Sequence, residues 1–466
     1  MQCKTTGWPD VFFEQKTIRD KPYKPIALSC PISDVNPLQC SIPFQSLQLA
    51  PMRRLNKPGS HKLSADGQRL ATFASAIVLS SSRIEERGWE SQLDALLQKL
   101  LKADHQDTLD GALDLLFQSD AMAYDVLMEA AEANSESAVL EYDDQLYDAL
   151  LLAVPVLAWT RFSIASGPIP ADIVLTLSAH LHAHVLAPDV KMAMAPTLFA
   201  IDQLPRSHVE TWTVTHRLAQ AALKNTVLRT PVSVPETAPF LADTRYLLAT
   251  VVVPAGAPLM RWQASINLDD RDLALAQWQA QALPSVTRLL PGCGIELLLP
   301  EAYYVACREG DRQIRPASIN AAVHFLHHTL SIEVRDLQAS IGSFGEDTIN
   351  GRADEYRIGF STGNEGEVVY GVVWPLYGEE DEEDMGDPAE LPLQRLAAGE
   401  VPHPTPLEEI TTLLRDAGVT RITHHPERFP LEFCDDCGAP LFPDPNAELV
   451  HAEMPEDAPQ GTPHFH

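Results

Sequence analysis

The chain is poor in basic residues and in cysteine. It has 34 Lys and Arg against 64 Asp and Glu, which gives a formal net charge of -30. Such a charge opposes binding to nucleic-acid phosphates and to anionic membrane surfaces, so we expect no nucleic acid and no membrane as a partner. Seven cysteines spread over 466 residues do not resemble a disulfide framework. Their number favours a reducing compartment, and we expect a cytoplasmic protein.

Long apolar runs are also missing. The longest run, residues 149–159, contains Pro155 and is much shorter than the roughly 20 residues that a transmembrane helix needs. The first residues lack a basic segment followed by an apolar one, which predicts that there is no secretory signal. The sequence also lacks a Gly-x-Ser-x-Gly elbow, a Walker loop and a Rossmann glycine pattern, so the familiar nucleophile and phosphate sites have no sequence support.

One short stretch near the end of the chain does point to a particular chemistry. Cys434 and Cys437 are separated by two residues and followed by Gly438. Two thiolates at this spacing can bind one side of a tetrahedral metal ion, and the glycine permits the positive φ that turns backbone N–H groups toward the sulfurs. The pattern predicts a structural zinc knuckle. A redox dithiol and a pair of reduced thiols are the alternatives, and Pro440 and Pro443 disfavour the helix that a redox dithiol needs.

The other zinc ligands must come from elsewhere, because the sequence has no second Cys-x-x-Cys. His451 follows Cys437 at a suitable spacing and is our first choice. His425 is our choice for the fourth ligand, ahead of His424, and folding could instead bring in Cys293 or Cys307. The predicted metal ligands are therefore Cys434, Cys437, His451 and His425.

Two further groups of histidines have helical spacing. His180 and His184 are four residues apart, and His324, His327 and His328 lie together. Neither group has the Glu of a metalloprotease motif. We therefore interpret both as solvent-facing polar positions.

The first half of the chain predicts an all-helical domain. Residues 1–60 show no sustained period and read as a disordered or extended segment, within which Met52 is an alternative start. From residue 61 to 230, apolar residues recur at helical spacing, which predicts a helical bundle or an irregular solenoid. After two helices between residues 64 and 101, the expected helices are 107–118, 120–134, 143–160, 170–186, 190–203 and 206–224.

The second half predicts an α+β region, so the fold class is α+β multidomain. Residues 231–377 read in the order strand, helix, two strands, helix, strand, which is the order of a ferredoxin-like unit. The expected elements are strand 246–253, helix 273–290, strands 294–300 and 303–308, helix 317–330, strand 337–344 and a hairpin of 356–360 with 368–374.

A charged segment interrupts this region. Residues 378–406 contain six consecutive acids and five prolines, which predicts a mobile acidic loop. Residues 407–466 then supply a helix, with Thr405 as its cap and Gly418 at its end, followed by a strand, the knuckle and a tail that complete the α+β domain.

Several long strings resemble one known family. They are ASGPIPAD, ETAPFLADTRYLL, VVYGVVWPLYG, EFCDDCGAPLFPDP and VHAEMPED. The likeness runs from Met52 to Asp457 and is to an uncharacterised beta-proteobacterial family classed only as a domain of unknown function. The resemblance implies a bacterial cytosolic protein and implies no activity.

We favour a non-catalytic binding or regulatory protein with a protein partner. The alternative is an enzyme with a site in the cleft between the helical and α+β halves, near Cys307, Arg308 and Arg315, where a thiol lies among cations. A pocket with convergent titratable groups would favour the enzyme.

Overall fold

The computed structural model describes residues 63–161, 163–229, 240–345, 353–362, 367–377, 380, 404–435 and 437–455. All of these residues belong to one compact unit of the chain. The segment 1–60 and most of the acidic loop therefore lie outside the described residues. No helix in the described part combines the length and the apolar character that crossing a bilayer requires.

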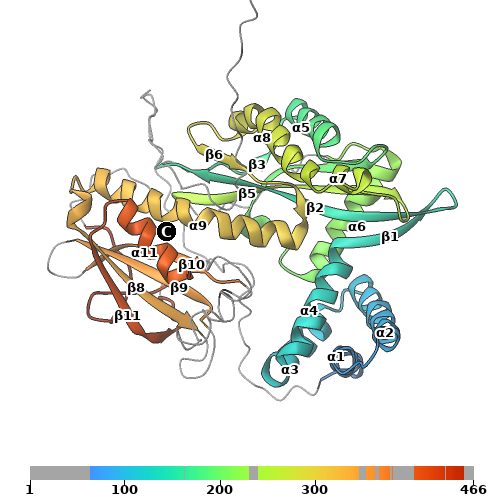
Figure 1. Cartoon of the computed structure of the whole chain (residues 1–466), viewed down its shortest axis with the longest axis horizontal. Helices are drawn as coiled ribbons and strands as arrows, with labels where there is room; N and C mark the ends of the chain where they lie inside the picture. Colours follow the sequence, from blue (N-terminus) through green and yellow to red (C-terminus); the bar gives the residue numbers. More distant parts are fainter. Residues whose placement is uncertain are drawn as a thin grey trace, which may run out of the picture. The chain divides into compact units, whose positions relative to one another are not determined.

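The first four helices form a core of their own (Figure 1). Leu70, Leu97, Leu113 and Leu127, one from each helix, are fully or almost fully buried in it. Within each helix the buried apolar residues recur at helical spacing, which is why the sequence predicted these four helices correctly. The helices are α1 (Ala65–Val78), α2 (Arg83–Lys102), α3 (Gln106–Ser119) and α4 (Ala121–Glu136).

A seven-stranded antiparallel sheet follows, in the order β1-β2-β5-β4-β3, with β6 and β7 also pairing with β2. Its strands are β1 (Ser137–Tyr142), β2 (Gln145–Trp159), β3 (Gly167–Pro168), β4 (Lys191–Ala200), β5 (Ala242–Pro254), β6 (Gly294–Leu297) and β7 (Glu301–Ala302). Between them lie α5 (Ala171–His184), η2 (Ile201–Gln203), α6 (His208–Lys224), α7 (Arg261–Ser265) and α8 (Asp269–Leu289).

Helices cover both faces of this sheet. Val154 of β2 packs with Leu177 of α5 and Trp278 of α8 in one cluster. Leu151, three residues earlier in β2, points to the opposite face and packs with Leu218 of α6. Because both faces are buried, the central strands β2 and β5 contain long apolar runs instead of an alternating pattern.

This double burial explains the main error of the sequence interpretation. The predicted helices 143–160 and 190–203 are wrong, because these residues form β2 and β4. A continuous apolar run has no period that separates a buried strand from a buried helix. Residues 61–230 are therefore not all helical. The predicted strand 303–308 is also wrong, since it is the first part of a long helix.

A second sheet of four strands has the order β10-β9-β8-β11, with β8 and β11 parallel. The predicted ferredoxin-like unit is not formed, because β5 and β6 belong to the larger sheet and β8 to the smaller one. The elements are α9 (Tyr303–Thr329), η3 (Val334–Asp336), β8 (Leu337–Gly345), β9 (Glu355–Thr362), β10 (Val368–Pro375), α11 (Pro406–Asp416), β11 (Arg421–Pro430), β12 (Phe442–Pro443) and β13 (Leu449–Val450).

The boundaries of α11 agree with the sequence signals. Thr405 accepts a hydrogen bond from the backbone N–H of Glu408, and the Glu408 carboxylate accepts one from the backbone N–H of Thr405, which forms a capping box. Gly418 follows the helix with a φ of +97°. Both predicted end signals are confirmed.

The long helix α9 contacts both sheets (Figure 1). Tyr303 and Ala306 in its first turns pack on β2 and β5. Ile319 and Leu326 in its second half pack on β8 and β9. Together with α11, the second half of α9 buries one face of the smaller sheet.

The other face of the smaller sheet carries glycines where the C-terminal segment packs. A Cβ atom on Gly371 would lie 2.2 Å from the ring of Phe442, and one on Gly359 would lie 2.5 Å from the carbonyl oxygen of Pro443. A Cβ on Gly342 would lie 2.7 Å from the ring of Phe429. These three positions therefore need glycine to let the aromatic side chains and the β12 backbone approach the sheet.

Replacing Gly371 with Ala should destabilise the protein by about 1 to 3 kcal/mol, the usual effect of overpacking a buried site. Gly88, in α2, has no atom within 4 Å of its added Cβ, so Gly88→Ala should instead stabilise by up to about 1 kcal/mol through helix propensity. Urea unfolding of both variants measures the two effects. Equal stability of the Gly371→Ala variant and the unsubstituted protein would show that Phe442 does not pack there.

Candidate metal site

The Cys-x-x-Cys stretch forms a tight turn. The backbone N–H of Cys434 donates to the carbonyl of Ala439 at 2.8 Å, and the N–H of Gly438 donates to the carbonyl of Cys434 at 2.8 Å. Gly438 has a φ of +75°, which a residue with a Cβ rarely adopts. The structure therefore confirms the conformation predicted for this glycine.

A short hairpin brings His451 to the two cysteines. His451 directly follows β13, which pairs with β12. Its Nε2 lies 3.2 Å from Sγ of Cys437, and the ligand atoms of Cys434, Cys437 and His451 all lie within 4.8 Å of one another. In a tetrahedral zinc complex a sulfur and a nitrogen ligand are about 3.6 Å apart and two sulfurs about 3.8 Å. The three residues could hold a metal ion after only small movements.

The second nitrogen of His451 also has a partner. Nδ1 lies 3.2 Å from Oε1 of Glu453, and the backbone N–H of Glu453 donates to the carbonyl of Val368 at 2.9 Å. A carboxylate on Nδ1 orients a metal-binding imidazole and keeps the proton on the nitrogen that faces away from the metal. Sequence reasoning missed Glu453, although its place two residues after His451 was visible.

His425 is not brought into this group. Its side chain is buried, and its Nε2 lies 2.9 Å from the carbonyl oxygen of Asp444. Because a carbonyl only accepts, Nε2 of His425 carries the proton and donates it, so this nitrogen is not a ligand in the observed conformation. Cys293 and Cys307 pack in clusters around the larger sheet. The three-donor group found in the described part of the chain does not include them.

A buried arginine holds the two ends of the knuckle loop together. Nη1 of Arg357, in β9, donates to the carbonyls of Glu432 at 2.6 Å and Leu441 at 2.8 Å. These residues lie on either side of the Cys-x-x-Cys turn, and the N–H of Leu441 also donates to the carbonyl of Glu432. Nε of Arg357 donates to the carboxylate of Glu355 at 2.6 Å. The guanidinium thus fixes where the loop begins and ends.

Two aromatic rings flank the same guanidinium. Its Cζ lies 4.3 Å from the ring centroid of Phe344 and 5.0 Å from that of Phe433, the residue before Cys434. Such contacts are favourable when the cation is removed from water. Sequence reasoning missed Arg357, and the available signal was a charged pair, Glu355 and Arg357, at the start of the predicted strand.

A second buried polar cluster lies on α9, away from the knuckle. The carboxylate of Asp311 accepts hydrogen bonds from the hydroxyls of Tyr246, in β5, and Tyr377, after β10, both at 3.1 Å. Burial raises the pKa of Asp311 to about 7, although the two hydroxyls and Arg315 oppose the shift. Burial also raises the pKa of the nearby Cys307 thiol. The sequence placed Cys307 near Asp311, but it did not predict Tyr246 and Tyr377, because both tyrosines are distant from Asp311 in sequence.

The cations of the enzyme hypothesis are paired within the protein. Arg315 makes two contacts with the carboxylate of Glu380, at 2.9 and 3.0 Å, and donates to the carbonyl of Pro375 at 2.8 Å. Arg308 makes two contacts with Glu132 of α4, at 2.8 and 2.9 Å. Glu380 is the residue of the six-acid run that the structure describes, and its carboxylate is paired with Arg315.

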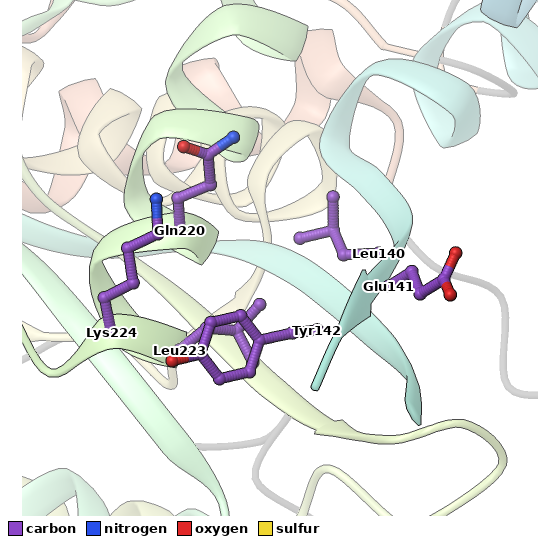
Figure 2. A pocket seen from close by; sticks show the side chains of 6 residues that line it. All are labelled: Leu140, Glu141, Tyr142, Gln220, Leu223 and Lys224. Carbon is purple, nitrogen blue, oxygen red and sulfur yellow. The ribbon is translucent and has the colours of Figure 1, made fainter. Parts of the chain in front are cut away.

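A shallow groove lies between β1 and α6 (Figure 2). It is partly open to solvent, has a cavity volume of about 140 Å³ and is lined by Leu140, Glu141, Tyr142, Gln220, Leu223 and Lys224. Figure 2 shows Gln220 and Lys224 on one side, with the Glu141 carboxylate pointing away from them. The groove therefore offers an amphipathic surface without convergent catalytic groups.

Together these features define a mixed helix and sheet protein with a C-terminal Cys2His group that could hold a metal ion. The chain belongs to the family described as "Protein of unknown function (DUF2863)", whose model matches residues 55–465. This match confirms the predicted membership in a family of unknown function. No curated protein and no solved structure matches the chain.

The raised pKa of Asp311 predicts how stability depends on pH. An unfolded chain releases this proton near pH 3.8, whereas the folded protein keeps it up to about pH 7. Since the folded state binds the additional proton, this group's contribution to stability is full at low pH, declines between these two values and is lost above about pH 7.

Asp311→Asn should remove this decline, because the amide mimics the protonated acid. Thermal unfolding of both proteins from pH 5 to pH 8 measures it, at about 1.4 kcal/mol for each unit of pKa shift. The difference between the two proteins should change from pH 5 to about pH 7 and then level off, since all other titrations are shared. A constant difference would contradict the assignment.

Proposed function

We propose that this is a non-catalytic binding or regulatory protein whose C-terminal loop is a structural zinc knuckle formed by Cys434, Cys437 and His451. The observation that supports it is the convergence of the three ligand atoms within 4.8 Å. Two thiolates and an imidazole are a donor set that zinc prefers. Asp311, Arg308 and Arg315 make their hydrogen bonds within the protein, which favours binding over catalysis.

The structure brings three donors together, so a tetrahedral ion would need a fourth ligand from elsewhere. His425 would have to give up its hydrogen bond to Asp444 and rotate to serve as a ligand. A donor from a partner would complete a closed, structural site without that cost, whereas water in this position is the arrangement of catalytic zinc sites. We therefore rank His425 behind an external donor.

We place the protein in the cytoplasm of a bacterium, with another protein as its partner. The low cysteine content suits a reducing compartment, and the resemblance to beta-proteobacterial sequences suits a bacterial origin. The net charge of -30 favours a basic surface on the partner.

Elemental analysis of protein purified without added metal should find about one zinc per chain, as a single tetrahedral site requires. Cys434→Ser should lose this zinc, because one of only two thiolates is removed. Cys293→Ser is the matched control and should keep it, since Cys293 packs near the larger sheet.

Metal removal should also affect only part of the chain. The turn 433–440 should become accessible to protease or to hydrogen exchange, because it lies between the ends that Arg357 holds and buries little apolar surface of its own. Helices α1 to α4 should stay protected, since their core is separate. A zinc-free protein in which the turn 433–440 stays fully protected would refute the structural role of the metal.

A further inference from the structure

Two histidines on the second half of α9 face each other. Nε2 of His324 and Nε2 of His328 are 3.0 Å apart. The ring centroids are 4.3 Å apart, and the ring planes are inclined by 63°. Residues four apart lie on the same side of a helix, so both rings emerge next to each other from adjacent turns.

This separation fits two ligands of one metal ion. With metal-to-nitrogen bonds of 2.0 to 2.1 Å, two imidazoles at neighbouring positions of an octahedral or tetrahedral ion are about 2.9 to 3.4 Å apart. The observed 3.0 Å lies in this interval. An ion could therefore replace the present contact between the nitrogens without a change in the helix backbone.

We propose that His324 and His328 form a second metal site, specific for a divalent cation with affinity for imidazole, such as Zn²⁺, Ni²⁺ or Cu²⁺. The remaining positions would be filled by water, because His328 is exposed. Imidazole suits these ions better than Mg²⁺ or Ca²⁺, which prefer oxygen ligands. The site shares no residue with the knuckle and does not depend on it.

The charges of the protein have opposite effects on the binding of a cation by this pair. Arg161 lies close enough to His324 to act on it electrostatically and would repel a cation. The net charge of -30 favours cation binding over the molecule as a whole. His327 has a separate role, since its Nδ1 donates to the carbonyl of Ile332 at 2.6 Å.

The chain contains a matched control for the spacing. His180 and His184 on α5 are also four residues apart, but their rings are stacked with centroids 6.1 Å apart and an angle of 19°. Nδ1 of His184 is also within 3.1 Å of the amide oxygen of Gln277. This second pair has the same sequence pattern without convergent nitrogens, so it should not bind the ion in the same way.

The test is a calorimetric titration of Ni²⁺ into protein that has been given one equivalent of zinc per chain. The two thiolates and the imidazole of the knuckle take this zinc first, so the knuckle does not compete and the His324–His328 pair is left empty. The unsubstituted protein should bind about one Ni²⁺ per chain. His324→Gln and His328→Gln should each weaken binding at least about tenfold. Loss of a residue that only orients a metal ligand already costs that much affinity, and these variants lose a ligand itself. His184→Gln should bind Ni²⁺ as tightly as the unsubstituted protein.

Two controls keep the result interpretable. Circular dichroism of the variants should match the unsubstituted protein, because Gln is a good helix former. Cys434→Ser should retain Ni²⁺ binding, which separates this site from the knuckle. Absence of Ni²⁺ binding to the unsubstituted protein would overturn the proposal. If both His→Gln variants bind Ni²⁺ as tightly as the unsubstituted protein, the proposal is overturned too, because the ion then binds at other histidines.

Discussion

The buried guanidinium of Arg357 is the contact on which the C-terminal segment depends. One of its nitrogens donates to the carbonyls of Glu432 and Leu441, so the two ends of the knuckle loop meet at one point. A buried charge is costly unless it is paired, and Glu355 supplies the countercharge. Removing either partner would cost about 3 to 5 kcal/mol. The sheet therefore positions the loop, and a bound metal would only have to order the turn between fixed ends.

Helix α9, which contacts both sheets, also contains buried polar groups that need partners within the protein. Pro316 has no N–H to continue the helical ladder. The carbonyl of Arg312, its missing partner, instead accepts a hydrogen bond from Nε of Arg315. Asp311 directly precedes Arg312 and accepts hydrogen bonds from the hydroxyls of Tyr246, in β5 of the larger sheet, and Tyr377, just after β10 of the smaller sheet. The polar cluster thus gives hydrogen-bond partners to buried polar groups at the point where α9 passes from one apolar core to the other. These residues resemble a catalytic set, but this role is structural.

The sequence was informative wherever a local signal decided the outcome. The spacing of Cys434, Cys437 and His451 predicted the three donors that converge, and Thr405 predicted the start of α11. It failed for β2 and β4, because burial on both faces removes the alternation that identifies a strand. It also failed for Arg357, whose partners are about 75 to 84 residues away in the chain. Such contacts leave no local pattern.

The central claim is that a metal ion is bound by two sulfurs and a nitrogen in a loop whose ends the sheet holds in place. X-ray absorption at the zinc edge of the purified protein tests it most directly. The account predicts two sulfur ligands at about 2.3 Å and nitrogen or oxygen ligands at about 2.0 to 2.1 Å. A shell of four sulfurs, or one with no sulfur at all, would contradict it.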